Sequence, residues 1–443
     1  MAGPVLHPGS RPSGDLPPDA VAKLVAVSRR LAGTANLSDV LSTVIDALRD
    51  LLDAERATVF EYDAAAEQLF TQVAHGLGGR QGSGVIRIPA SRGIAGAAAT
   101  GRRIVNIADA YADERFNRDV DRQTGYHTRS ILAIPLLDHE GGLVGVAQVL
   151  NRRSGPFREV DEMLAEGLAA QAAVAIRRGR MIEDRIARER MERDLAAARS
   201  IQQGSFPAAL PELRGWQIAA ASEPAEQCGG DAFDVVPLER GAIVAPEDPA
   251  DALVLLVADA TGHGIGSALS AMQARGMLRM GLRLGQSIDR IVSECNRQLC
   301  QDLPMGRFVT GWFAHVDLGS GRVRSVAAGQ GPVMLYRRAG DAFQTLPTDA
   351  PPMGVVPEDL APVDGGITMQ PGDILIALTD GYFESQDPSG EQWQQARCEE
   401  LVRELRDHSP RAILAACNAT MSDWCQGRPP ADDRTAIILK RLG

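Results

Sequence analysis

The sequence has almost no lysine and no long apolar run. Lys23 and Lys440 are the only lysines, so arginine carries nearly all of the positive charge, and the net charge is still −11. Such an excess of negative charge opposes broad attraction to nucleic-acid phosphates or anionic lipid. No apolar stretch approaches the roughly 20 residues that a membrane-spanning helix requires. We therefore expect no nucleic-acid partner and no membrane partner.

Paired cysteines and an export signal are also missing. The six cysteines lie in the second half of the chain without a CxxC pair, which is untypical of a disulfide framework. The first residues, MAGPVLHPGSRPSGDLPPDA, lack the basic-then-apolar pattern of a secretory signal and are rich in Pro and Gly. We predict that residues 1–20 are a disordered tail and that the protein is cytoplasmic.

The rest of the sequence predicts an α+β protein with two domains joined by a helix. Helical periodicity up to Leu52 and strand-like segments such as SILAIPLL and LVGVAQVL predict a first domain over 21–178. A proline-free run of more than 40 residues follows Phe157, and its charged part, 179–206, is predicted to be a helical linker. Short strands and turns dominate 207–443, which predicts a largely antiparallel second domain.

Acidic residues recur in the second domain where an apolar strand meets a tight turn. The segments are CGGDAFD with Asp231, LLVADATGHG with Asp259, ALTDG with Asp380, and ADDRT with Asp432 and Asp433. Carboxylates at strand ends can point into one cleft, where they would repel one another unless cations lay among them. Oxygen ligands without paired histidines favour Mg²⁺ or Mn²⁺ over zinc. Two such ions ~3.5–4 Å apart can activate a water for attack on phosphorus, so phosphomonoester hydrolysis is expected.

Other interpretations of these motifs stay open. An aspartate beside glycine is also the ordinary composition of a turn. The segment GGDAF resembles the GGDEF loop of diguanylate cyclases, although Ala232 stands where the cyclase needs an acidic residue and TDG and DDRT stay unexplained. A catalytically inactive sensor that only binds a partner through a phosphatase-like module is the third alternative.

Together, the order of the motifs over about 193–442 resembles the PPM, or protein phosphatase 2C-like, family in the bacterial branch of the stage II sporulation protein E phosphatases. The elements include SIQQGSFP, CGGDAFD, VADATGHGIGSALS, AAGQGPVMLY, LTDGYFES and DDRTAIIL. The resemblance implies a β-sandwich flanked by helices and two Mn²⁺ or Mg²⁺ ions. It implies as ligands the side chains of Asp231, Asp259, Asp380 and Asp432, the carbonyl of Ala260 and, in support, Asp433.

The same resemblance implies a serine/threonine phosphoprotein phosphatase. Its expected substrate is phosphoserine on a STAS-domain anti-sigma factor antagonist, and His263 is a candidate proton donor to the leaving oxygen. This chain departs from the family at two places: Gln330 stands where the family commonly has histidine, and Ala232 and Phe233 stand where it often has tyrosines. Asp234 is expected to orient the loop rather than to bind metal.

The first domain resembles a GAF domain of the kind found in cyclic-nucleotide phosphodiesterases. The family's scattered signature appears here as Asn151, Arg152, Phe157, Asp161 and Glu162. This signature supports the fold around the pocket, and arginine in place of lysine can keep the salt bridge.

A cyclic nucleotide is one candidate ligand of this domain, although the signature by itself does not establish nucleotide binding. Arg92, Asp109, Phe116 and Thr128 are candidate pocket-lining residues, and an empty or dimerising domain is the alternative. The resemblance, together with the linker, favours a homodimer formed through the GAF domain and the helix. A solvated single helix is the alternative for the linker, because the spacing between Ile186 and Met191 breaks strict heptads.

Overall fold

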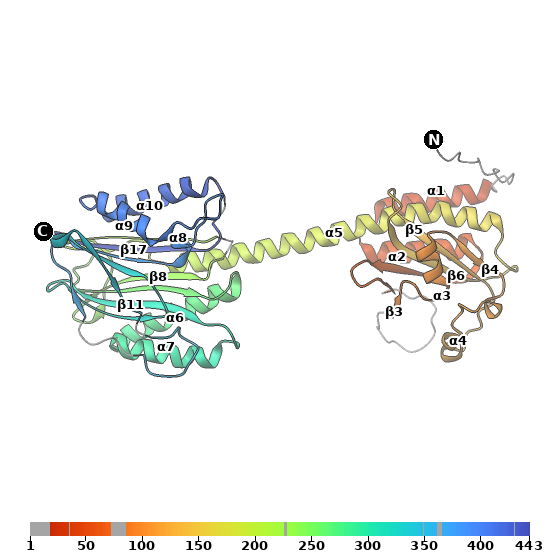
Figure 1. The fold of residues 1–443 in the computed structure, drawn as a ribbon. Coiled ribbons are helices and arrows are strands. Elements are labelled where there is room, and N and C mark those ends of the chain that lie inside the picture. Colours follow the sequence, from red (N-terminus) through yellow and green to blue (C-terminus); the bar gives the residue numbers. More distant parts are fainter. Residues whose placement is uncertain are drawn as a thin grey trace. The chain divides into compact units, whose positions relative to one another are not determined.

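The computed structural model describes residues 18–34, 36–71, 86–225, 228–348, 350–360, 366–428 and 430–443 as a mixed α+β chain (Figure 1). Two compact units divide the chain into Met1–Arg190 and Met191–Gly443, a division that falls inside the predicted linker 179–206. Of the predicted tail, residues 1–17 lie outside the described part, whereas Pro18 already begins helix α1.

The first unit is a six-stranded antiparallel sheet with helices on both faces. The sheet order is β3-β2-β1-β6-β5-β4, and β5 and β6 form the predicted central hairpin. The elements are α1 (Pro18–Gly33), α2 (Leu37–Leu51), β1 (Ala54–Asp63), β2 (Gln68–Thr71), β3 (Ile86–Pro89), α3 (Gly93–Gly101), β4 (Val105–Ile107), η1 (Ala110–Ala112), α4 (Arg118–Thr124), β5 (Ile131–Leu137), β6 (Leu143–Arg152) and α5 (Glu159–Ser205).

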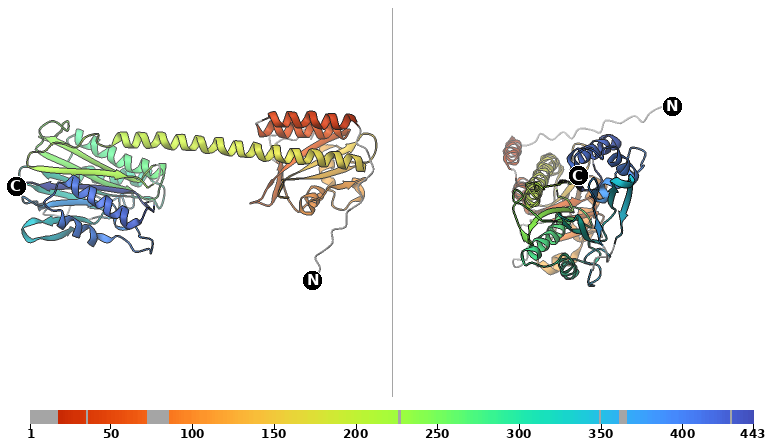
Figure 2. Two further views of the ribbon diagram at one scale, coloured as in Figure 1. Left: turned by 90° about the horizontal axis from the view of Figure 1, so that it is seen from above. Right: turned by 90° about the vertical axis from the view of Figure 1, so that its left-hand side faces the viewer.

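Two apolar cores lie on opposite faces of this sheet. The larger core joins α2 and the first part of α5 to one face, and Figure 2 shows α1 beside that layer. The smaller core packs α3 against the other face. Both helices of the larger core have the one-sided apolar pattern that the periodicity predicts, so burial of that face positions them.

The expected fold-supporting signature is present in this unit. Asn151 is fully buried, and its side chain accepts from the backbone of Arg129 at 2.6 Å and donates to Glu55 at 3.0 Å. Arg152 Nε lies 3.1 Å from Asp161 Oδ2 with both side chains nearly buried, so arginine keeps the predicted salt bridge. These contacts join β6 to the neighbouring strands and to the start of α5.

Helix α5 runs without interruption for 47 residues. Several of its apolar side chains face solvent, among them Val174, Met181, Ile186 and Met191, which are 43–65% exposed. Among the described residues, no helix combines the length and the apolar content needed to cross a bilayer.

The second unit is a sandwich of two antiparallel sheets flanked by helices. The sheet orders are β15-β12-β11-β10-β8-β9 and β14-β13-β16-β17-β7. The elements are β7 (Trp216–Glu223), β8 (Asp231–Glu239), β9 (Ala242–Ile243), β10 (Ala252–Ala260), α6 (Ile265–Arg283), α7 (Ile288–Asp302), β11 (Val309–Asp317), β12 (Arg322–Ala328), β13 (Val333–Arg337), η2 (Arg338–Gly340), β14 (Ala342–Leu346), β15 (Ile367–Thr368), β16 (Ile374–Leu378), α8 (Asp380–Phe383), α9 (Gln394–Glu404), α10 (Pro410–Cys425) and β17 (Arg434–Arg441).

Three apolar layers hold this sandwich together. One core lies between the sheets, a second joins α6 and α7 to the outer face of the first sheet, and a third joins α9 and α10 to the outer face of the second. Figure 1 shows these helix pairs on opposite sides of the sandwich. The strands are buried on both faces, which explains why β10 reads as a continuous apolar run, ALVLLVADA.

Candidate metal-binding active site

The predicted ligands come from both sheets of the sandwich. Asp231 begins β8 and lies directly opposite Asp259 in the antiparallel pairing of β8 with β10. Asp380 begins α8 just after β16, and Asp432 precedes β17, the neighbour of β16 in the second sheet. The electrostatic interactions of Asp259 reach Asp231, Asp380, Asp432 and Asp433, so the structure brings together the aspartates that the sequence singles out.

A buried threonine links the two sheets at this point. The Thr379 hydroxyl donates to Asp231 Oδ2 at 2.8 Å and accepts from the Thr435 backbone N–H at 2.9 Å. Both threonines are fully buried, so these bonds fix the orientation of the Asp231 carboxyl. Thr379 directly precedes Asp380 in the LTDG segment, but a threonine before an aspartate carries no sequence signal for this role.

Asp432 and Asp433 differ in their surroundings. Asp433 is buried, and its carboxylate accepts from the backbone of Ala225 at 2.7 Å and of Asp231 at 3.4 Å. Asp432 is exposed, and within the part of the chain that the structure describes its carboxylate accepts one hydrogen bond, from the adjacent Asp433 backbone at 2.8 Å. Asp433 therefore holds the loop that leads into β8, and its expected role as a supporting metal ligand stays a prediction.

The glycines of the GGD and TDG motifs stand where two backbone segments approach each other closely. A Cβ on Gly381 would overlap the Asp433 carbonyl oxygen, and one on Gly230 would lie 2.6 Å from the Ala260 carbonyl oxygen. The Ala260 backbone also donates to the Gly230 carbonyl at 3.1 Å. Gly230 and Gly381 are therefore required because the strand ends pack against one another without room for a side chain.

The carboxyl groups of the cluster are held in a setting that disfavours their charge. Burial raises the pKa of Asp259 to about 7, and repulsion from Asp380 and Asp432 adds to that rise. Burial followed by repulsion from Asp259 raises the pKa of Asp231 well above its usual range, and burial also raises the pKa of Asp380. A cation placed among them would relieve both effects.

The donor set suits hard cations that keep part of their water shell. Among the residues described, no three His, Cys, Asp or Glu side chains surround a single point closely enough to hold an ion by themselves. Mg²⁺ usually binds through one or two carboxylates and retains several waters, unlike ions held in an all-protein cage. The available carboxylates, together with the Ala260 carbonyl, fit such ions.

Asp234 lies at the interface between β8 and α6. Its fully buried carboxylate receives two hydrogen bonds from Arg279, at 2.6 and 2.7 Å, and Arg275 lies 3.1 Å away. The side chain therefore forms a buried ion pair between sheet and helix. These arginine partners lie 41 and 45 residues away along the sequence, so the segment CGGDAFD gives no sign of them.

His263 and Gln330 occupy different settings. His263 has an exposed side chain in the loop between β10 and α6, flanked by Gly262 and Gly264, both with positive φ. Gln330 is buried, accepts from the Thr310 hydroxyl at 2.8 Å and donates to the Leu378 carbonyl at 3.2 Å. Gln330 thus links the strand beside Asp259 to the end of β16.

The last turns of α5 touch the loop that carries Asp231. Gln202 is buried, and its side-chain amide donates to the Gly229 carbonyl at 2.8 Å and to the Asp231 carbonyl at 3.3 Å. The Gly229 backbone donates back to Gln202 Oε1 at 3.4 Å. The segment SIQQGSFP contains this glutamine, but among polar neighbours on a helix nothing in the sequence singles it out as the one with such a partner.

The four candidate pocket residues of the first unit have diverse surroundings. Arg92 and Asp109 are exposed, and Phe116 is half-buried against the core beneath α3. Thr128 is buried, and its backbone N–H and hydroxyl donate to the Asp121 carboxylate at 2.7 and 2.8 Å. Thr128 therefore has a structural partner already, and the assignment of the four residues to a ligand stays a prediction.

Comparison with known proteins gives matches for both units. The family model for stage II sporulation protein E (SpoIIE) matches residues 249–442, and the GAF domain model matches residues 36–176. The SiaA-PP2C domain of Pseudomonas aeruginosa is a similar solved structure, with 21% identity, a TM-score of 0.48, and coverage of 58% of this chain and 99% of that one.

Two curated relatives match parts of the chain. The probable 3',5'-cyclic phosphodiesterase pde-5 of Caenorhabditis elegans is 33% identical over 156 residues, which are 33% of this chain and 21% of the relative. Protein IcfG of Synechocystis sp. is 25% identical over 275 residues, 56% of this chain and 41% of the relative. The chain thus spans less than half the length of either relative. With both family models matched, the chain carries a GAF domain followed by a PPM-type phosphatase domain of the SpoIIE family.

Proposed function

We propose that the chain is a metal-dependent serine/threonine phosphoprotein phosphatase regulated by its GAF domain. The observation that supports this most is the meeting of Asp231, Asp259, Asp380 and Asp432 from four separate segments at one end of the sandwich. Bound Mn²⁺ or Mg²⁺ ions would neutralise phosphate charge and lower the pKa of a coordinated water.

The residues of the chain then have distinct tasks. Asp259, whose charge interacts with the other carboxylates, would be the central ligand, and Asp231, Asp380, Asp432 and the Ala260 carbonyl would complete the set. Thr379 orients Asp231 through its 2.8 Å hydrogen bond. His263, exposed in the loop before α6, is the candidate donor of a proton to the leaving serine oxygen.

The test is hydrolysis of p-nitrophenyl phosphate with and without Mn²⁺. We expect metal-dependent turnover in the full chain and a loss of about a thousandfold or more in Asp259→Asn. The matched control is Asp184→Asn, an exposed aspartate of α5, which should keep full activity. Equal activity in Asp259→Asn and the control, with both variants folded by circular dichroism, would refute the proposal.

The proposed substrate is phosphoserine on a STAS-domain anti-sigma factor antagonist, and its support is the family resemblance. A phosphorylated STAS-domain protein should release phosphate faster than a phosphotyrosine peptide at equal concentration. Faster release from the phosphotyrosine peptide would remove this substrate class and leave the metal chemistry untouched.

The proposed regulation uses α5, whose residue Gln202 bonds to the loop of Asp231. A change in the helix would move that loop and alter metal occupancy. Cyclic nucleotide is the proposed ligand. We expect cyclic AMP or cyclic GMP to change the turnover of the full chain and a helix-breaking insertion after Arg188 to abolish that response. An unchanged response in the insertion variant would contradict transmission through α5. If neither nucleotide changes the turnover of the full chain, the proposal that a cyclic nucleotide is the ligand is wrong.

A homodimer through the GAF domain and α5 is the proposed assembly. Its support is the exposure of Val174, Met181, Ile186 and Met191 along one long helix, because contact with a second copy would remove part of this apolar surface from water. Light scattering should give twice the 47.2 kDa chain mass, and Met181→Glu combined with Met191→Glu should shift it toward the monomer. A monomer at micromolar concentration would refute the dimer.

A further inference from the structure

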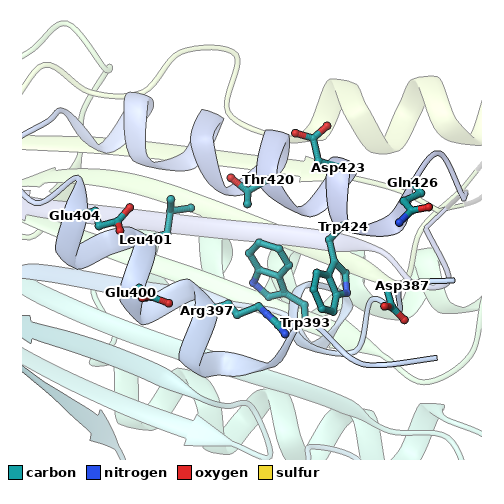
Figure 3. A pocket seen from close by; sticks show the side chains of 10 residues that line it. All are labelled: Asp387, Trp393, Arg397, Glu400, Leu401, Glu404, Thr420, Asp423, Trp424 and Gln426. Carbon is teal, nitrogen blue, oxygen red and sulfur yellow. The ribbon is translucent and has the colours of Figure 1, made fainter. Parts of the chain in front are cut away.

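A cavity of about 520 Å³ lies between α9 and α10, and none of the candidate metal ligands lines it. Figure 3 shows Trp393 and Trp424 side by side in this cavity. Their rings meet edge to face with centroids 6.0 Å apart. Trp393 is only 4% exposed, so it forms a fixed apolar wall, whereas Trp424 is half-buried and presents part of its ring to the opening.

The remaining lining is strongly acidic. Glu400 and Glu404 lie one turn apart on α9, Asp423 lies on α10 and Asp387 in the loop before α9, against the single cation Arg397. Within the described part of the chain, the carboxylates of Glu400, Glu404 and Asp423 have no ion-pair or hydrogen-bond partner. The fold therefore leaves a negative charge beside an aromatic wall without neutralising it.

The fold does not need these charges for its own stability. Asp423 lies in the last turn of α10, a turn without a basic residue, although the carboxyl end of a helix favours positive charge. Two carboxylates one turn apart on α9 also repel each other. A bound cation would reverse both unfavourable effects.

The chain itself shows how this cavity receives a cation. The Arg397 guanidinium lies 3.8 Å from the centre of the Trp424 ring and 2.7 Å from a carboxylate oxygen of Glu391. Stacking on tryptophan combined with a carboxylate partner is a favourable setting for guanidinium and ammonium groups. Farther along the cavity, Glu400 and Glu404 offer the same acidic partners without an internal cation.

We propose that this cavity is a docking site for a basic peptide segment of a partner protein. An arginine or lysine side chain of that segment enters beside the tryptophan pair, and its charge is met by Glu400 and Glu404. The charge of the cavity selects a cationic partner and rejects nucleic acid and phosphate. Tryptophan and arginine are the residue types that dominate the energetics of protein interfaces, which agrees with a peptide as the occupant.

The chain has four tryptophans. The test uses the full chain with all four replaced by 5-fluorotryptophan. The probe is the peptide Gly-Arg-Leu-Arg-Gly, with Gly-Glu-Leu-Glu-Gly as the acidic control. We expect saturable shifts of the ¹⁹F resonances of Trp393 and Trp424, assigned by single Trp→Phe variants. The resonances of Trp216 and Trp312, which are buried in the sandwich core, should not move.

Matched charge reversals separate this site from general attraction to an acidic protein. Glu400→Lys with Glu404→Lys changes the net charge as much as Glu212→Lys with Glu247→Lys, and all four positions are exposed. We expect the peptide affinity to fall by about tenfold or more in the first variant and by less than about threefold in the second. Equal losses in the two variants, equal shifts with the acidic peptide, or no shift at all would overturn the proposal.

Discussion

The Thr379 hydroxyl and the Asp231 carboxylate, 2.8 Å apart, join the two sheets of the sandwich where the aspartates meet. Thr379→Val keeps the shape of the side chain but leaves the Asp231 carboxyl and the Thr435 N–H without this partner. We expect turnover to fall about tenfold or more and stability to fall by about 1–3 kcal/mol. Phosphatase assays and urea unfolding measure the two effects.

The conservative change provides the control for this prediction. Thr379→Ser retains the hydroxyl and should keep most of the activity. The metal concentration needed for half-maximal turnover should rise only in the valine variant. If serine and valine variants behave alike, the lost methyl packing and not the hydrogen bond is responsible.

Metal-free stability should depend on the charge of Asp259. Its folded pKa of about 7 lies above the value near 4 of an unfolded chain, so the folded state binds the proton more tightly. The contribution of Asp259 therefore becomes less favourable as pH rises from about 4 to about 7, by up to about 1.4 kcal/mol per pH unit, and then levels off.

The experiment compares the full chain with Asp259→Asn by urea unfolding in EDTA. The asparagine variant should be the more stable protein at pH 8, and its advantage should shrink as pH falls to 5. Saturating Mg²⁺ should cancel the advantage, because the cation stabilises the carboxylate. An advantage that is constant with pH would contradict the prediction.

A methyl group at position 381 should disrupt the site. The Cβ of Gly381→Ala would overlap the Asp433 carbonyl oxygen, which is backbone and cannot swing aside. We expect a loss of more than about 2 kcal/mol in unfolding free energy and of most metal-dependent activity. Gly276→Ala in α6, where no atom lies within 4 Å of the added Cβ, should raise stability by up to about 1 kcal/mol and leave turnover unchanged.

The ion pair of Asp234 should matter for folding and not for metal binding. Asp234→Asn leaves Arg275 and Arg279 without their counter-charge between β8 and α6. We expect a loss of about 3 kcal/mol in stability. The Mn²⁺ concentration for half-maximal turnover, measured well below the melting temperature, should stay within about twofold of the unsubstituted chain; a large rise would instead place Asp234 among the metal ligands.

The sequence predicted those parts of the molecule that repeat a strong local pattern. Strand β10 and helix α6 follow from an apolar run and a helical period, and the Asp–Gly segments mark the strand ends where Asp231, Asp259 and Asp380 lie. At these positions the same Asp–Gly residues indicate both a turn and a candidate metal ligand, so both could be predicted from the sequence.

The contacts that position these groups could not be predicted in the same way. The bond from Thr379 to Asp231 spans 148 residues and that from Arg279 to Asp234 spans 45, and neither has a local signature. The tryptophan cavity between α9 and α10 depends equally on how two helices pack. The pairing of polar side chains across elements is set by tertiary packing, which periodicity does not encode.

The hydrogen bonds between Gln202 and Gly229 affect where the chain can be cut to isolate its second unit. A fragment that starts at residue 207, after the helix, would lose the glutamine amide, and the Gly229 carbonyl and N–H beside Asp231 would lose these partners. A low activity of such a fragment would then reflect the altered loop and not the proposed phosphatase site. A fragment that reproduces the site of the full chain therefore has to include the final turns of α5 with Gln202.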